Sequence, residues 1–182
     1  KIERYPIRGL MIRKTFESEI QQVKDEVILL GSMVEHAIIG SVEALKKRDL
    51  VAAEKIIAED KEINKKRFAI ENQLMILIAT QQPMAHDLRL LASTMEIISE
   101  LERMGDYAKG IAKVAEELAD DETPVPIREI CTMADLAVSM LHRALSAFIA
   151  EDLDTARALP AEDDQVDYAK GIAISSIVHT DD

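Results

Sequence analysis

The sequence is poor in the residues that stabilise small folds by means other than a packed core. It contains one cysteine, no tryptophan, six glycines and five prolines among 182 residues. A single cysteine excludes an intrachain disulfide and fits a reducing compartment, so we expect a cytoplasmic protein. The scarcity of glycine and proline excludes a loop-rich chain and favours long helices joined by short turns. The longest unbroken apolar run, LMILIA at 74–79, is far shorter than the roughly 20 residues of a membrane span.

Basic residues are also in short supply. The chain has 22 lysines and arginines against 34 aspartates and glutamates, which gives a net charge of −12. Such a chain repels a phosphate backbone, so we expect no nucleic-acid partner. The same acidity suits cations, although acidic surfaces also serve simply to keep helical proteins soluble.

Apolar residues recur at alternating steps of three and four through most of the chain. This spacing is typical of helices that bury one face. Asp49 is expected to cap the second helix, and Pro83 is expected in the first turn of the third. No stretch alternates with a period of two, so we predict an all-α fold. The first helical stripe contains Phe16, Ile20, Val23, Val27, Leu30, Val34, Ala37 and Ser41.

The chain contains an internal repeat. Residues 48–64 align with residues 151–167 at an offset of 103, with identities at Asp49, Leu50 and Ala53 and again at Ala58, Glu59 and Asp60. The heptapeptide DYAKGIA occurs at 106–112 and at 167–173, an offset of 61. We therefore predict two tandem antiparallel three-helix bundles, each starting with two antiparallel helices.

The two offsets meet at Asp167 and differ by 42 residues. The second bundle is therefore expected to be incomplete, lacking about 42 residues near position 167. Either the protein lost this segment, or the natural chain is longer, with about 224 residues; we favour the longer chain. Deleting most of a helix hairpin would remove the core of the second bundle.

Oxygen-bearing side chains recur four residues apart, which places both members of a pair on one helix face. Carboxylates in this arrangement can ligate hard cations, although most such pairs lie on solvated surfaces. Asp60 and Glu102 fall on apolar stripes, where a charge needs a partner or a cation. We predict metal ligation by Asp60 with Asn64, Glu102 with Asp106, and Asp163 with Asp167.

Four segments carry a family resemblance. MIRKTFESEIQQVKDEVILLGSMVEHAI, AEDKEIN, QQPMAHDLRLL and ISELERMGDYAKGIA together resemble the PhoU family. The resemblance implies two three-helix repeats with acidic motifs that bind metal clusters, iron first, with zinc, nickel, manganese or magnesium as alternatives. It also implies a homodimeric, non-catalytic regulator of phosphate uptake and phosphate-starvation signalling. Its partners would be the phosphate ABC transporter, through its ATPase, and a sensor histidine kinase. Contact with a membrane would be peripheral at most.

The motif does not transfer equally to every position. Glu102 and Asp106 match it fully, whereas Asn64 stands where an aspartate is common and would bind metal without charge. Asp167 can belong to either motif of the second repeat. We expect a leader or vector-derived segment at 1–10, a first repeat at 11–120, a linker at 121–126 and a second repeat at 127–182.

Two alternatives remain open. A di-metal carboxylate oxidoreductase would need Glu-x-x-His on two helices, and no glutamate lies three residues before His36, His86, His142 or His179. A helical scaffold without metal is the other alternative. We expect no catalytic residues and no organic cofactor site, because no nucleophile elbow, P-loop or dinucleotide fingerprint is present.

Overall fold

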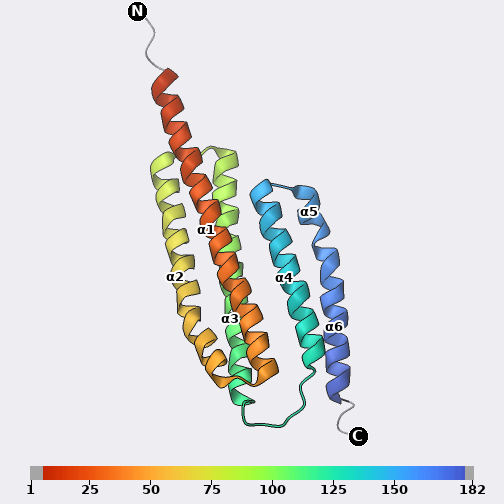
Figure 1. Ribbon diagram of the computed structural model, residues 1–182. Coiled ribbons are helices and arrows are strands. Elements are labelled where there is room, and N and C mark those ends of the chain that lie inside the picture. Colours follow the sequence, from red (N-terminus) through yellow and green to blue (C-terminus); the bar gives the residue numbers. More distant parts are fainter. Residues whose placement is uncertain (1–5, 179–182) are drawn as a thin grey trace, which may run out of the picture.

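The computed structural model describes residues 6–178, with side chains from Phe16 to Ile177. Six helices follow one another along this part of the chain, and it contains no β-strand (Figure 1). The helices are α1 (Pro6–Lys47), α2 (Leu50–Gln81), α3 (Ala85–Glu117), α4 (Ile127–Ala150), α5 (Leu153–Ala158) and α6 (Pro160–Val178). The all-α prediction is confirmed. The expected leader at 1–10 lies partly outside the described residues, and helix α1 begins at Pro6. His179 also lies outside the described residues.

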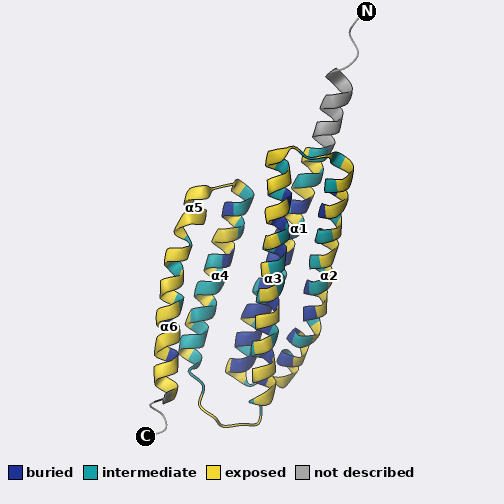
Figure 2. Ribbon diagram, turned by 180° about the vertical axis from the view of Figure 1, so that it is seen from behind, coloured by how far each residue is buried: buried dark blue, intermediate teal, exposed yellow. Residues whose placement is uncertain are grey.

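Helices α1, α2 and α3 pack against one another as a closed three-helix bundle. Its core follows the predicted apolar stripe, since Val27, Leu30 and Val34 are fully buried, and the buried positions face the bundle axis (Figure 2). Asp49 caps α2 as predicted, accepting a hydrogen bond from the Ala52 backbone N–H. The prediction for Pro83 was wrong by two residues: α3 starts at Ala85, and Pro83 lies in the connection at 82–84 that precedes it.

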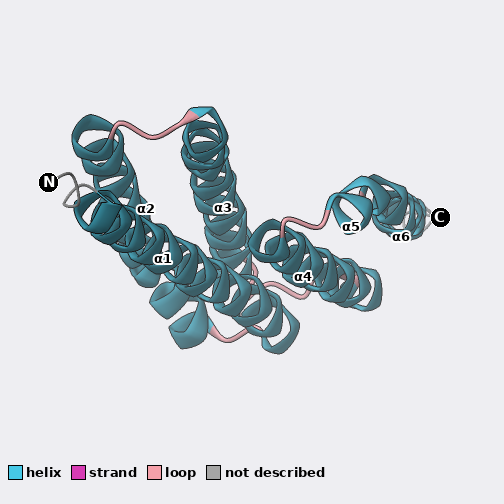
Figure 3. Ribbon diagram, turned by 90° about the horizontal axis from the view of Figure 1, so that it is seen from above, coloured by secondary structure: helices cyan, strands magenta, loops and turns pink. Residues whose placement is uncertain are grey.

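The second repeat is a hairpin. Helix α4 packs against α1, and the chain returns through α5 and α6 along the far side of α4. Seen from above, α6 stands at the edge of the molecule and packs only on α4 and α5 (Figure 3). No third long helix closes this bundle within residues 6–178. The prediction of an incomplete second bundle is therefore confirmed. Helix α6 passes through Asp167 without interruption.

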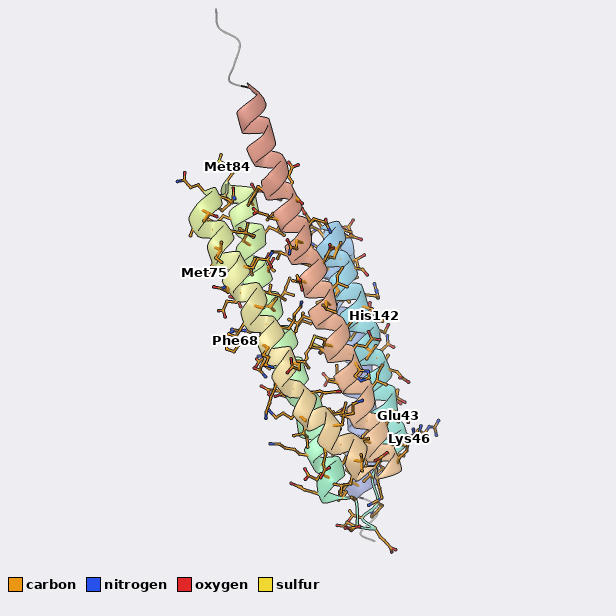
Figure 4. The ribbon with its side chains drawn as sticks, turned by 60° about the vertical axis from the view of Figure 1, so that its left-hand side comes forward. Glu43, Lys46, Phe68, Met75, Met84 and His142 are labelled. Carbon is orange, nitrogen blue, oxygen red and sulfur yellow. The ribbon has the colours of Figure 1, made fainter. Side chains whose placement is uncertain are left out.

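A close approach of α1 and α4 joins the two repeats. A Cβ atom on Gly31 would lie 2.3 Å from Cδ1 of Leu145, so the absence of a side chain at position 31 lets α4 approach α1 closely. Polar contacts flank this point: His142 Nε2 lies 2.7 Å from Glu35 Oε2, and Lys24 Nζ lies 3.1 Å from Glu151 Oε1. His142 projects from α4 on the side of the molecule away from Met75 (Figure 4).

Two helices are longer and more apolar than the short unbroken runs suggested. Segment Phe16–Lys47 of α1 and the whole of α4 have the length and composition to cross a membrane, a property shared by core helices of soluble proteins. The apolar window of α1 is 50% buried in the molecule, whereas that of α4 is only 11% buried. Helix α1 therefore has the burial of a core helix, whereas most large apolar side chains of α4 are only half-buried.

The core of the first bundle generates a stability prediction. We expect Leu30→Ala to lower the free energy of unfolding by about 2–5 kcal/mol, because it opens a cavity at a fully buried position between three helices. The matched control is Leu29→Ala, one residue earlier on the same helix but 50% exposed, which should cost less than about 1 kcal/mol. Urea unfolding followed by circular dichroism measures both. Equal losses would show that α1 does not bury this face.

Candidate metal centre

The candidate site lies next to a tight contact between α2 and α3. Gly105 of α3 is buried, and a Cβ atom there would lie 3.1 Å from Cδ1 and 3.2 Å from Cγ2 of Ile63. This tight contact leaves room for little more than a hydrogen atom on α3. It also brings the residues one turn away on each helix within reach of one another.

Asp60 is the buried acidic residue of the site. Its side chain sits on the apolar stripe of α2 and the residue is only 4% exposed. Asn64, one turn later, donates from its side-chain amide to Asp60 Oδ2 at 3.4 Å and to the Asp60 carbonyl oxygen at 3.2 Å. Oxygen Oδ1 of Asp60 is buried and has no hydrogen-bond partner within the described part of the chain. A carboxylate oxygen in this state is costly unless something binds it.

Lys109 of α3 supplies the charge that Asp60 requires. Its Nζ donates to Asp60 Oδ2 at 2.6 Å and lies 3.7 Å from Asp106 Oδ1. The hydrogen bond with Asp60 is the main reason why the pKa of Lys109 is raised above the usual value for a lysine. One ammonium group thus links a buried carboxylate on α2 to a more exposed one on α3.

Glu102 and Asp106 form the second pair of the first repeat. They lie one turn apart on α3, Glu102 half-buried and Asp106 with its side chain 51% exposed. Asp106 shares Lys109 with Asp60, so the structure brings Asp60, Asn64 and Asp106 to one point between two helices. Glu102 is on the side of Asp106 away from Lys109 along α3.

Asp163 and Asp167 lie elsewhere, on the exposed surface of α6. Asp167 accepts a hydrogen bond from Lys170 at 2.8 Å, and this contact raises the pKa of that lysine. Because α6 packs only on α4 and α5, no helix of the first bundle faces these carboxylates. The structure therefore does not join the third predicted pair to the other two.

The residues present are a partial fit to a metal ion. An aspartate with one unpartnered oxygen, an amide carbonyl and a nearby aspartate and glutamate are hard oxygen donors of the kind that divalent cations take. Among the described residues, however, no three histidine, cysteine, aspartate or glutamate side chains converge closely enough to hold a metal ion. The donor set suits a cation, and the position nearest Asp60 is taken by the Lys109 ammonium.

Reasoning from the sequence missed Lys109. It stands three residues after Asp106 inside the repeated heptapeptide, on the helix face that turns toward Asp60. The spacing of three residues between Asp106 and Lys109 can be read from the sequence. The contact of Lys109 with Asp60, 49 positions earlier in the chain, cannot.

The buried ion pair generates a second prediction. Lys109→Met leaves the Asp60 carboxylate buried without a cation, and should lower the free energy of unfolding by about 1–3 kcal/mol at neutral pH. Lys170→Met removes the corresponding lysine of the second heptapeptide from a solvent-exposed pair, and should leave the free energy of unfolding essentially unchanged.

The same pair predicts a pH dependence. Since the folded-state pKa of Lys109 is raised, its contribution is complete below the unfolded-state value of about 10.4 and is lost as the pH rises through the folded-state value. From neutral pH upward, the stability difference between the wild type and Lys109→Met should therefore shrink only in strong alkali. A difference that disappears between about pH 7 and pH 9 would contradict the assignment. Urea titrations at several pH values measure it.

Comparison with known proteins extends the geometric description. The PhoU domain family matches residues 27–115 and 130–175. The phosphate-specific transport system accessory protein PhoU homolog of Clostridium acetobutylicum is 39% identical over 158 residues, which are 86% of this chain and 72% of that protein. The accessory protein PhoU of Escherichia coli is 32% identical over 152 residues, 84% of this chain and 63% of that protein. Both relatives are thus longer than this chain.

Solved structures agree with the sequence comparisons. The crystal structure of PhoU from Pseudomonas aeruginosa superposes with a TM-score of 0.84 at 30% identity, covering 91% of this chain and 79% of that one. The structure of the phosphate transport system regulatory protein PhoU from Streptococcus pneumoniae gives 0.83 at 32% identity, with 90% and 77% covered. The match of both repeats, the shared helical architecture and the identity to curated relatives place this chain in the PhoU family.

Proposed function

We propose that this chain is a non-catalytic regulator of phosphate uptake and of phosphate-starvation signalling. In this proposal it acts in the cytoplasm by contact with the phosphate ABC transporter, through its ATPase, and with the phosphate sensor kinase. The observation that carries the proposal is the similarity along most of the chain to proteins named as accessory to the phosphate-specific transport system. The fold agrees with this role, since long helices present large surfaces for contact.

Metal binding is part of the proposal and rests on the α2–α3 site. The buried Asp60 carboxylate with its unpartnered oxygen supports it, as does the proximity of Asp106. Asp60, Asn64, Glu102 and Asp106 would hold the metal, iron or another divalent ion such as zinc, nickel, manganese or magnesium. A bound divalent ion would neutralise the acidic cluster and tie α2 to α3. Asp163 and Asp167 would form a separate, more exposed site.

The oxidoreductase alternative has less support. Di-metal carboxylate enzymes place histidines next to the bridging carboxylates. Two histidines have partners elsewhere: His142 pairs with Glu35 of α1, and His86 is near Glu151 at the end of α4. His36 lines a cavity with Glu59, Glu62 and Ile63, and no Glu-x-x-His motif includes it. We therefore do not propose redox chemistry at this site.

A genetic experiment tests the regulatory role. Expressed in a bacterium that lacks its own PhoU, the chain should restore repression of a phosphate-starvation reporter in high phosphate by several-fold. Asp60→Asn should lose much of this repression, since it removes the charge that a cation needs. The control Glu59→Gln changes the neighbouring half-buried glutamate, which contacts Lys55, and should repress like the wild type. A reporter that stays fully active despite folded wild-type protein would overturn the proposal.

We also propose that the chain is a homodimer joined through the surface between α4 and α6. This α4–α6 surface is a groove of about 610 Å³. It includes Leu136, Tyr168, Ala169 and Ile172, with Arg128 and Glu129 toward one end and Asp164 toward the other. Tyr168 is 73% exposed and Ile172 is 42% exposed, and α4 is apolar yet little buried.

Charge favours a second copy as the occupant of this surface. Helices α4 and α6 run antiparallel, so Arg128 and Asp164 stand at opposite ends of the groove. A two-fold axis through its centre would place Arg128 against Asp164 of the partner subunit, and the reverse. The apolar residues between them would meet their own counterparts, as an isologous interface requires.

The dimer is tested by light scattering after size exclusion. The wild type should have about twice the chain mass of 20.3 kDa. Ile172→Glu should elute as a monomer, because its dimer would bury two unpaired carboxylates at the interface. Val51→Glu, at a 75% exposed position on α2, should remain dimeric. A monomeric wild type at every concentration, or a dimeric Ile172→Glu, would refute this interface.

A further inference from the structure

We propose that Lys109 is a built-in competitor that occupies the cation position of the first acidic motif and weakens metal binding there. The inference rests on the metal-binding part of the proposed function. Lys109 Nζ donates to Asp60 Oδ2 at 2.6 Å and lies 3.7 Å from Asp106 Oδ1, so one ammonium lies between the two carboxylates that a metal ion would join.

The ammonium satisfies the site only in part. It reaches one oxygen of Asp60, while the other oxygen stays buried and unpartnered among the described residues. Asn64 does not correct this, because its amide also approaches Oδ2. A divalent cation can contact both oxygens of one carboxylate, whereas a single ammonium hydrogen bond engages one. The unused oxygen therefore indicates a site that accepts a cation other than Lys109.

Lys109 has a route out of the site. Its side chain is 30% exposed although that of Asp60 is only 5% exposed, so the ammonium can swing toward solvent without opening the bundle. Asp106 lies on the same helix three residues earlier, and its side chain is 51% exposed. Its exposure means that this side of the Lys109 contact already borders solvent. Metal entry thus requires a side-chain rotation of Lys109 and no helix movement.

Competition lowers the apparent affinity for metal. A site that is available only in the fraction of molecules with Lys109 displaced binds more weakly by that fraction. The neutral Asn64 adds to this effect, because it leaves Asp60 as the one charged side chain of its pair. Lys109 would therefore set the metal concentration at which the first motif binds a metal ion.

The second heptapeptide provides a matched comparison. Lys170 occupies the position of Lys109 and contacts Asp167 at 2.8 Å, but both side chains are more than half exposed. No buried carboxylate lies behind that pair. Removing Lys170 should therefore leave metal affinity at the first motif unchanged.

Manganese binding to tag-free protein tests the proposal, with free Mn²⁺ measured by electron paramagnetic resonance. Lys109→Met should bind Mn²⁺ about tenfold or more tightly than the wild type, because no ammonium competes. Lys109→Arg, which keeps a cation, and Lys170→Met should both bind like the wild type. Adding Asp60→Asn to Lys109→Met should abolish the gain. Equal or weaker binding by Lys109→Met would overturn the proposal.

A second measurement uses the wild-type protein and does not depend on a variant folding. Acylation of lysine amines by a succinimidyl ester, followed by mass spectrometry, reports the exposure of each ammonium. Saturating Mn²⁺ should raise the labelling rate of Lys109 several-fold and leave that of Lys170 unchanged. Unchanged Lys109 labelling with Mn²⁺ bound would refute the displacement. If neither the wild type nor Lys109→Met binds Mn²⁺, this inference and the proposed metal binding both fail. The reporter experiment still decides the regulatory role.

Discussion

The structure depends on the burial of one apolar stripe along α1. Val27, Leu30 and Val34 on this stripe are fully buried, and α1 packs against α2, α3 and α4. Both repeats therefore pack against α1. Because Gly31 of α1 has no side chain, α4 can approach α1 closely at this position. Removing apolar surface from α1 would affect both repeats, because α1 is the helix of the first bundle against which α4 packs.

The apolar core of the first bundle includes a buried charged residue, Asp60, which requires a counter-charge. Asp60 lies on a stripe that otherwise carries isoleucines such as Ile56 and Ile63, and burial of a lone carboxylate is strongly unfavourable. The bundle resolves this with Lys109, and the same carboxylate is the one best placed for a metal ion. Fold stability and cation affinity are therefore coupled through one residue. Whatever replaces the ammonium must also replace its contribution to stability.

The second repeat shows how far an internal comparison predicts structure. The two offsets correctly indicated a bundle that lacks a helix. They did not indicate that the segments before and after Asp167 would continue as the single helix α6. Its first part corresponds to α2 and its last part to the end of α3, and the less exposed positions Glu162, Val166, Ala169 and Ala173 still follow one helix face across the junction. Ala169 and Ala173 are buried against α4, whereas Tyr168 and Ile172 remain exposed.

Local signals in the sequence were sufficient for the helices, for the Asp49 cap and for the acidic pairs one turn apart, because each depends on residues within about four positions. The internal repeat and the family resemblance together predicted the arrangement of repeats, which the comparisons confirm. Only the tertiary structure decided which of these acids lies buried and what faces it. Asp60 meets Lys109 across 49 residues because α2 and α3 pack tightly at Ile63 and Gly105. Asp163, its counterpart at the repeat offset, is exposed because no third helix covers α6. The chemistry of an acidic side chain is local, but its burial and its counter-charge are set by packing between distant segments.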